Sequence, residues 1–332
     1  MYSAPVKYEY DFKLEKEKTM WMKVFPAAAA AALLVSQTWA DEVWATSMKS
    51  GHVLAIDPDS MSVTATIPTA AGAHNVTFSQ DGRVALVADV GATNVTIIDA
   101  EAKAVLSQVP AAKKAHDVSI SPDGRLAIAA NVGTDFVTLI DVAKGEPIGE
   151  VTTGDGAMMS VFSPDGSTLY VANARAATIS VIDVRSRSVK MTMPGAKGMM
   201  AFVLMPHDDT AWATGPADDK LLKIDLAKGK AIAEVAVPGA PHGMALSGDG
   251  RSLYVVQRKL NQIIELDPAT GRILRTASVG QRPDMMAISP DGASLFVVSR
   301  DENKLLKLSA ADLAIIGEVE TGEEPHGVAY RP

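Results

Sequence analysis

A turn sequence recurs along this chain at a constant spacing of 42 residues, and this spacing constrains the fold more than any other feature. Its clear copies are Ser121–Gly124, Ser163–Gly166 and Ser289–Gly292, each reading Ser-Pro-Asp-Gly. A variant copy and two degenerate copies keep the same register, at Ser79–Gly82, Met205–Asp208 and Ser247–Gly250. A fixed period of this length predicts an array of similar structural units.

The residues between successive turns predict four short strands. In the unit after Ser163–Gly166, apolar and β-branched residues occupy Ser167–Asn173, Thr178–Asp183 and Ser188–Met193, and the run Met199–Met205 leads to the next turn. Short strands separated by Gly, Pro, Asp and Asn are typical of antiparallel all-β structure. Four strands in about 42 residues are typical of one propeller blade.

The ends of the repeat array predict a closed ring. Residues 41–332 open on the second strand of a blade, Val43–Ser47, and finish on an innermost strand, Gly327–Tyr330. Pairing these two segments completes a blade and removes the open edges of the array. We therefore predict an all-β fold with a single domain over 41–332. This domain is a seven-bladed β-propeller of four-stranded antiparallel blades, closed by pairing of its N- and C-terminal segments.

The first 40 residues predict export from the cytoplasm. Lys23 precedes an apolar run, Val24–Val35, and small residues follow at Thr38 and Ala40. This pattern predicts a secretory signal peptide over 20–40, cleaved near Ala40–Asp41, and hence a periplasmic or secreted protein without a transmembrane segment. The run is shorter than the ~20 residues that span a bilayer, and an uncleaved anchor is the alternative. We interpret residues 1–19 as an upstream extension or a start-site artefact.

Composition and motifs narrow the function classes. The net charge of −8 argues against nucleic acid as a partner, because phosphate binding needs a basic surface. The absence of cysteine excludes disulfides, thiolate metal sites and c-type haem attachment. The sequence has no HExxH, GxSxG, P-loop or GxGxxG motif. We therefore expect a monomeric binding protein rather than an enzyme.

The repeat resembles a known family. The segments Tyr170–Asn173, Val181–Asp183, Pro241–Ala245 and Ser289–Gly292 are similar to the YVTN family of β-propeller repeats. This resemblance implies a secreted or surface seven-bladed propeller, similar to surface-layer, cytochrome-d1-like and lactonase-like propellers. The similar blades and the absence of a catalytic motif favour a binding or scaffold role, and the resemblance implies that this role is accessory to a redox or quinoprotein system. It does not fix one activity, because the same fold carries many functions.

One position of the repeat concentrates chemically active side chains. The residue that begins each predicted inner strand, expected at one mouth of the central channel, reads His74, His116, Met158, Met200, His242, Asp284, His326. Imidazole, carboxylate and thioether groups are metal ligands, and a mixture of His and Met suits copper. We expect His326, His74 and His116 as the first candidate ligands of copper, zinc or iron. The alternative is that Pro-His-Gly is the usual sequence of the family's repeat at this position and binds no metal.

Two arginines are expected beside these histidines. Arg258 and Arg300 follow the second strands of neighbouring blades, on the face that carries His242, Asp284 and His326. Paired guanidinium groups can hold a carboxylate or phosphate, although exposed arginines can equally serve solubility.

Three functions follow from these candidates. The first is binding of a periplasmic protein or small-molecule ligand at the channel mouth, through the residues His74, His116, His242, Asp284, His326, Arg258 and Arg300. The second is a metal-binding protein or enzyme. The third is a lactonase-like hydrolase, for which Asp284 is the candidate catalytic residue.

Overall fold

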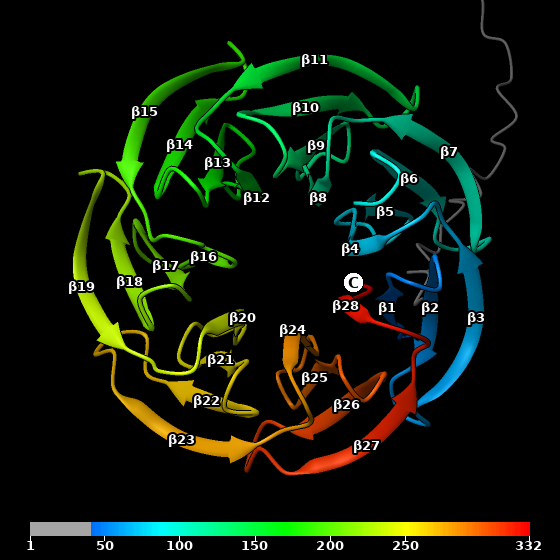
Figure 1. Ribbon diagram of the computed structural model, residues 1–332, viewed down its shortest axis with the longest axis vertical. Coiled ribbons are helices and arrows are strands. Elements are labelled where there is room, and N and C mark those ends of the chain that lie inside the picture. The colour runs from blue at the N-terminus through cyan, green and yellow to red at the C-terminus, as the bar shows by residue number, and fades with distance from the viewer. Residues whose placement is uncertain (1–40) are drawn as a thin grey trace, which may run out of the picture. The chain divides into compact units, whose positions relative to one another are not determined.

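The computed structural model describes residues 41–332, which form a ring of seven four-stranded antiparallel sheets (Figure 1). The predicted extension 1–19 and signal peptide 20–40 lie outside the described residues. We number the sheets as blades around the ring. Blade 1 contains β28 (Pro325–Tyr330), β1 (Val43–Ser47), β2 (His52–Asp57) and β3 (Ser62–Pro68). Blade 2 contains β4 (Ala73–Phe78), β5 (Val84–Asp89), β6 (Asn94–Asp99) and β7 (Ala104–Pro110).

The other blades repeat this order, from the inner strand to the outer strand. Blade 3 contains β8 (Ala115–Ile120), β9 (Leu126–Asn131), β10 (Phe136–Asp141) and β11 (Glu146–Thr152). Blade 4 contains β12 (Ala157–Phe162), β13 (Thr168–Asn173), β14 (Thr178–Asp183) and β15 (Ser188–Pro194). Blade 5 contains β16 (Phe202–Leu204), β17 (Thr210–Gly215), β18 (Lys220–Asp225) and β19 (Lys230–Ala236). Blade 6 contains β20 (Pro241–Leu246), β21 (Leu253–Gln257), β22 (Gln262–Leu266) and β23 (Ile273–Ser278). Blade 7 contains β24 (Pro283–Ile288), β25 (Ser294–Ser299), β26 (Lys304–Ser309) and β27 (Ile315–Glu320).

The two ends of the described chain share blade 1, which confirms the predicted closure. The last strand, β28, pairs antiparallel with β1, so that Trp44 faces Ala329 and Val43 faces Tyr330. Figure 1 shows the red β28 beside the blue β1 at the centre of the ring. Arg331 then donates from Nε to the carbonyl of Gly82, at 2.8 Å. Closure gives every blade a neighbouring blade on both sides and leaves the ring without a terminal blade.

Burial follows the position of each strand in its blade. The two middle strands are buried on both faces, because each blade is covered by its neighbours, and they read as nearly continuous apolar runs. The large residue of the second strand fills the space between blades, as the fully or almost fully buried Trp44, Trp212 and Phe296 show. The outer strands are exposed apart from single residues such as Val109.

The recurring turn is built by its own side chains. In the copy at Ser121–Gly124, Ser121 Oγ donates to Asp123 Oδ1 at 2.6 Å and accepts from the backbone N–H of Leu126 at 3.0 Å. Gly124 takes a φ of +72°, which glycine adopts without strain. The aspartate of this turn therefore has a structural role.

Blade 5 departs from the repeat at its inner strand. The backbone N–H groups of Met200 and Ala201 donate to the side-chain Oγ1 of Thr214 in β17, at 3.1 and 2.9 Å, and not to a backbone carbonyl of that strand. As a result β16 has only three residues and begins after Met200. The predicted ring of inner-strand residues is therefore irregular at this position.

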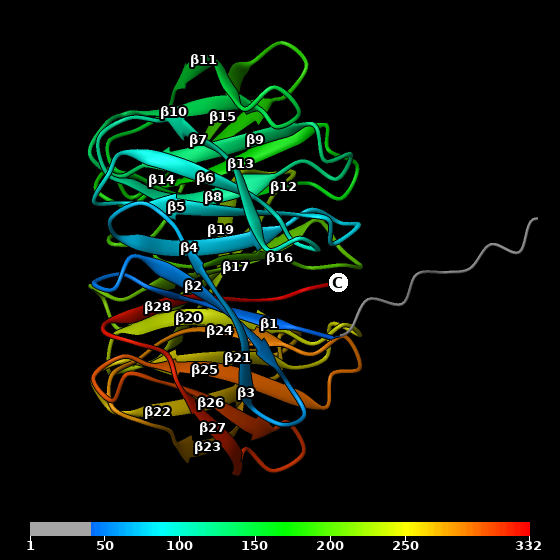
Figure 2. The ribbon, with the colours of Figure 1, turned by 90° about the vertical axis from the view of Figure 1, so that its right-hand side faces the viewer.

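Loops project from both faces of the ring (Figure 2). We call the face with the Ser-Pro-Asp-Gly turns the turn face, and the opposite face the mouth face. Within residues 41–332, no helix has the length and hydrophobicity needed to cross a membrane.

Candidate functional site

A β-bulge presents the residues of the mouth face. In every inner strand except β16, the pairing with the second strand shifts register at the position that the sequence singled out. In β4, for example, Ala73 pairs with Asp89 and Asn75 with Ala88, so that His74 has no partner of its own. Bulges turn a side chain away from the regular ladder and are frequent beside active sites. We call His74, His116, Met158, Met200, His242, Asp284 and His326 the mouth ring.

Two histidines of the mouth ring connect neighbouring blades. The Nδ1 atom of His74 donates to the carbonyl of His116 at 2.8 Å, and Nδ1 of His116 donates to the carbonyl of Met158 at 3.0 Å. Thr46 Oγ1 donates to the carbonyl of His74 at 2.7 Å and continues the chain into blade 1. These contacts give His74 and His116 a structural role that needs no metal.

All four histidines of the mouth ring gather in one cluster. The ring centroid of His74 lies 4.0 Å from that of His116 and 3.6 Å from that of His326. The ring centroid of His242 lies 5.9 Å from that of His326. Burial and the neighbouring histidines lower the pKa of His74 well below its usual value, and burial lowers the pKa of His116 and His242 to about 4. The imidazoles are therefore neutral at pH 7.

Asp284 is the centre of the site. Its side chain is fully buried, and its Oδ2 accepts from Arg258 Nη2 at 2.6 Å and from Arg300 Nη1 at 3.1 Å. Burial would raise the pKa of Asp284, but His242, Arg258 and Arg300 together hold it below its usual value. The two arginine side chains are 21% and 13% exposed, so they are largely buried ion-pair partners and not solvated surface groups.

The other oxygen of Asp284 faces two histidines. Asp284 Oδ1 lies 3.1 Å from His242 Nδ1 and 3.7 Å from His326 Nε2. Among residues 41–332, this is the one group of three His, Asp or Glu side chains whose ligand atoms all lie within 4.8 Å of one another. The expected set of His326, His74 and His116 does not meet that criterion. Met158 and Met200, on which the expectation of copper rested, belong to blades 4 and 5, whereas this group comes from blades 6, 7 and 1.

Asn75 and Asp117 support His326, and the sequence analysis did not identify them. Asn75 Nδ2 donates to Asp117 Oδ1 at 3.0 Å, and Asn75 Oδ1 lies 3.2 Å from His326 Nδ1. Both residues occupy the position after the mouth ring, which is Met, Ala or Gly in the other five blades. The sequence could have revealed them, because two polar residues in adjacent blades occupy a position that is otherwise apolar.

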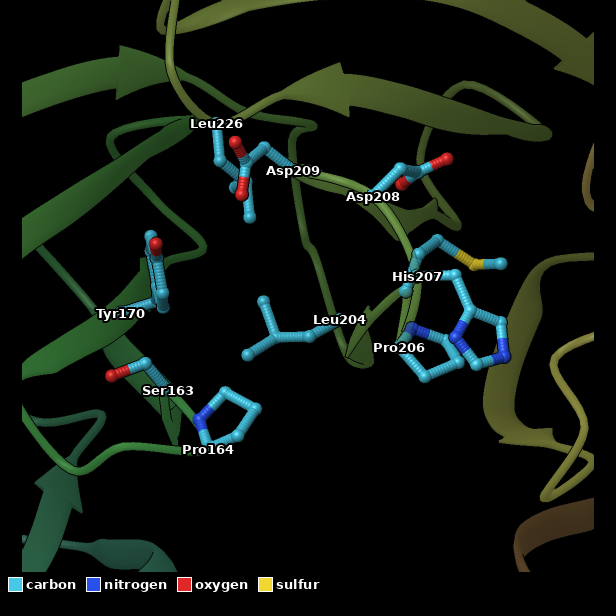
Figure 3. Close-up of a pocket in the computed structure, with 10 residues that line it drawn as sticks. Ser163, Pro164, Tyr170, Leu204, Pro206, His207, Asp208, Asp209 and Leu226 are labelled. Atoms are coloured by element: carbon cyan, nitrogen blue, oxygen red, sulfur yellow. The ribbon is translucent and has the colours of Figure 1, made fainter.

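Hollows of the described chain lie both beside this site and remote from it. One, of about 560 Å³, occupies the channel beside Asn75, Asp117 and Ser160. Another, of about 380 Å³, lies at the degenerate turn of blade 5, where Figure 3 shows His207 at its margin and Leu204 near its centre. His207 is exposed on the turn face, remote from the mouth ring.

The comparisons with known proteins agree with this architecture. A family model described as "Lactonase, 7-bladed beta-propeller" matches residues 101–312. The chain belongs to this family. No curated protein matches the sequence.

Several solved structures share the fold of this lactonase-family propeller. Periplasmic gluconolactonase PpgL of Pseudomonas aeruginosa has a TM-score of 0.74 at 19% identity, over 88% of this chain and 99% of that one. Hydrazine synthase of Kuenenia stuttgartiensis has a TM-score of 0.73 at 19% identity, over 79% and 90%. The dihydro-heme d1 dehydrogenase NirN has a TM-score of 0.66 at 18% identity, over 87% and 75%. At these identities the likeness concerns the fold.

Proposed function

We propose that this lactonase-family propeller binds a small carboxylate ligand, a hydroxy acid or its lactone, at the mouth face. The observation that carries this proposal is the arrangement of Arg258 and Arg300 around a single buried carboxylate. Arg258 and Arg300 are balanced by Asp284 and by Glu324, and an excess of one positive charge appears when the half-exposed Glu324 turns towards solvent. Such an excess favours an anion, because charge is poorly screened away from water.

Hydrogen-bond donors remain available for that ligand. The Nε–H groups of Arg258 and Arg300 are buried and have no partner within the described chain. Leaving such donors unsatisfied costs free energy, which a bound carboxylate would recover through charge-assisted hydrogen bonds. Arg300 also contacts Glu324, at 3.3 Å, through Nη2. Glu324 is half exposed, and we infer that it moves aside more easily than Asp284.

We place the protein in the periplasm or outside the cell, because residues 20–40 read as a signal peptide. Periplasmic gluconolactonase PpgL, which shares the fold, is consistent with that location and with a hydroxy-acid ligand. An accessory role beside a redox or quinoprotein partner remains an expectation from the resemblance to the repeat family. A ligand site at the mouth face is compatible with a partner docking around it.

Isothermal titration calorimetry with gluconate tests this binding proposal. We expect saturable binding by the wild type, and binding about tenfold weaker or worse in Arg258→Gln, because one charge-assisted hydrogen bond is lost. Arg251→Gln is the matched control, since Arg251 is 87% exposed on the turn face. The proposal is wrong if a panel of hydroxy acids gives no heat with the wild type, or if Arg258→Gln binds gluconate as the wild type does.

Hydrolysis of a lactone is the second candidate, favoured by the family model. In this reaction water adds to the carbonyl carbon, the ring C–O bond breaks, and a hydroxy acid is released. Arginine N–H donors could stabilise the oxyanion that forms. The ion pairs of Asp284 make it a weak base. We therefore assign Asp284 the role of orienting the His242 ring. Turnover on a panel of lactones tests this, and full activity of Asp284→Asn would exclude a role for Asp284.

A further inference from the structure

Three potential ligand atoms converge beside the arginine pair without a hydrogen bond of good geometry between them. They are His242 Nδ1, Asp284 Oδ1 and His326 Nε2, on side chains that are 4%, 0% and 3% exposed. Neither His242 Nδ1 nor Asp284 Oδ1 has a hydrogen-bond partner of good geometry. Buried polar atoms are almost always satisfied in folded proteins, so these orphans point to a missing partner.

The support of His326 determines which of its nitrogens carries a lone pair. Both oxygens of Asp117 accept hydrogen bonds, Oδ2 from the backbone N–H of Ser160 at 3.0 Å and Oδ1 from Asn75 Nδ2 at 3.0 Å. Asn75 Oδ1 then faces His326 Nδ1, which must donate. A neutral His326 therefore presents a bare Nε2 to Asp284 Oδ1, and both atoms are acceptors.

Two facing acceptors at 3.7 Å repel each other unless a donor or a cation lies between them. The separations fit a cation. With metal–ligand bonds of about 2.0–2.1 Å in a tetrahedron, ligand atoms lie roughly 3.3 Å apart. The two distances at Asp284 Oδ1, 3.1 and 3.7 Å, bracket that value.

We propose that the mouth face holds a divalent transition-metal ion through His242 Nδ1, Asp284 Oδ1 and His326 Nε2. Two imidazoles and one carboxylate are a ligand set suited to zinc or ferrous iron with coordination positions left open. Asn75 Oδ1 accepts from His326 Nδ1 and fixes the orientation of the ring, as carboxylates and backbone carbonyls do for metal-bound histidines. The arginines keep Asp284 ionised by pairing with its other oxygen.

This inference deepens the proposed function, because the metal and the arginines face the same ligand. A divalent ion beside two guanidinium groups would add to an existing positive charge. An anionic ligand completing the coordination would offset that charge. The site therefore favours bidentate hydroxy acids, whose carboxylate and hydroxyl oxygens can both reach a metal with open positions. We expect zinc and hydroxy acid each to raise the affinity for the other.

Zinc titration of the metal-free protein tests the site. The protein is stripped with chelator, and Zn²⁺ alone is titrated by calorimetry, with bound metal counted by elemental analysis. We expect one equivalent of zinc, and binding at least about tenfold weaker in His242→Gln and in His326→Gln. His207→Gln is the matched control, because it removes an exposed histidine of the turn face. Mg²⁺ should bind far more weakly, since imidazole ligands do not suit it.

The inference is overturned if the wild type retains no stoichiometric zinc, if both site variants bind zinc like the wild type, or if His207→Gln loses as much affinity. Should the site variants fail to fold, X-ray absorption of the zinc-loaded wild type decides instead, by showing or lacking scattering from two imidazoles. Because these measurements use no organic acid, they separate the two proposals. If the protein binds zinc but no hydroxy acid, the metal site stands and the proposed function is wrong. If it binds a hydroxy acid but no zinc, the proposed function stands and the metal site is wrong.

Discussion

His326 Nε2 and Asp284 Oδ1 face each other at 3.7 Å across the junction of blades 1 and 7. They are 42 residues apart in the sequence and occupy the same position of the repeat. The site is thus made by one repeat position whose residue changes from blade to blade. The structural contacts around these two residues lead to four predictions.

The amide of Asn75 should control zinc affinity without contacting the metal. Replacing it by alanine removes the acceptor for His326 Nδ1 and frees the imidazole to rotate or change tautomer. We expect Asn75→Ala to weaken zinc binding by about tenfold to a hundredfold, the range seen when the hydrogen-bond partner of a metal-bound histidine is removed. Calorimetry measures this, with Thr77→Ala on the same strand as control. Equal affinities of Asn75→Ala and the wild type would remove Asn75 from the site.

His116 should make the metal-free protein sensitive to mild acid. Its pKa is about 4 in the folded chain, because of burial, against an ordinary value of about 6.5. Between these values the unfolded state binds more protons, so the free energy of unfolding falls as the pH is lowered from 6.5 to 4. We expect His116→Gln to reduce this loss by about 1–3 kcal/mol. Urea unfolding at pH 7 and pH 4.5 checks this, and an unchanged pH dependence would contradict it.

Asp117 should act in the opposite direction. Burial raises its pKa from 3.8 to about 7, so the folded state holds the proton more tightly than the unfolded state, and stability falls as the pH rises between these two values. We compare the free energy of unfolding of Asp117→Asn with that of the wild type at each pH. We expect this difference to shift in favour of the variant by about 1–2 kcal/mol from pH 5 to pH 8, whatever its value at pH 5. Thermal unfolding at both pH values measures the difference. Asp59→Asn, on the 98% exposed Asp59, should show no such change.

The glycine after His326 should be essential to the bulge. A Cβ on Gly327 would lie 2.5 Å from the carbonyl oxygen of His74 and 2.7 Å from Asn75 Cα, both backbone atoms that cannot move freely. We expect Gly327→Ala to destabilise the protein by about 2 kcal/mol or more. Gly248→Ala is the control, because nothing lies within 4 Å of its Cβ position and its φ is not in the left-handed region. Similar melting temperatures for both variants would show that the close approach is unimportant.

The repeat made the architecture predictable, because turn chemistry and strand pattern recur in every blade. Strand β1 (Val43–Ser47) and the pairing of the chain ends follow from the sequence alone. The repeat also predicted that His242, Asp284 and His326 lie at the same mouth of the central channel. It did not predict which atoms converge, since that depends on the bulges and on the orientation that Asn75 imposes on His326. The sequence led us to expect His326, His74 and His116 as ligands, because it does not show that Nδ1 of His74 and of His116 donates to a backbone carbonyl.

The metal site is tested most directly by anomalous X-ray diffraction from crystals of the zinc-loaded protein, recorded on either side of the zinc absorption edge. We expect one strong anomalous peak at the mouth face, within bonding distance of His242 Nδ1, Asp284 Oδ1 and His326 Nε2. No peak at the mouth face, or a peak held by His74 and His116 instead, would contradict it.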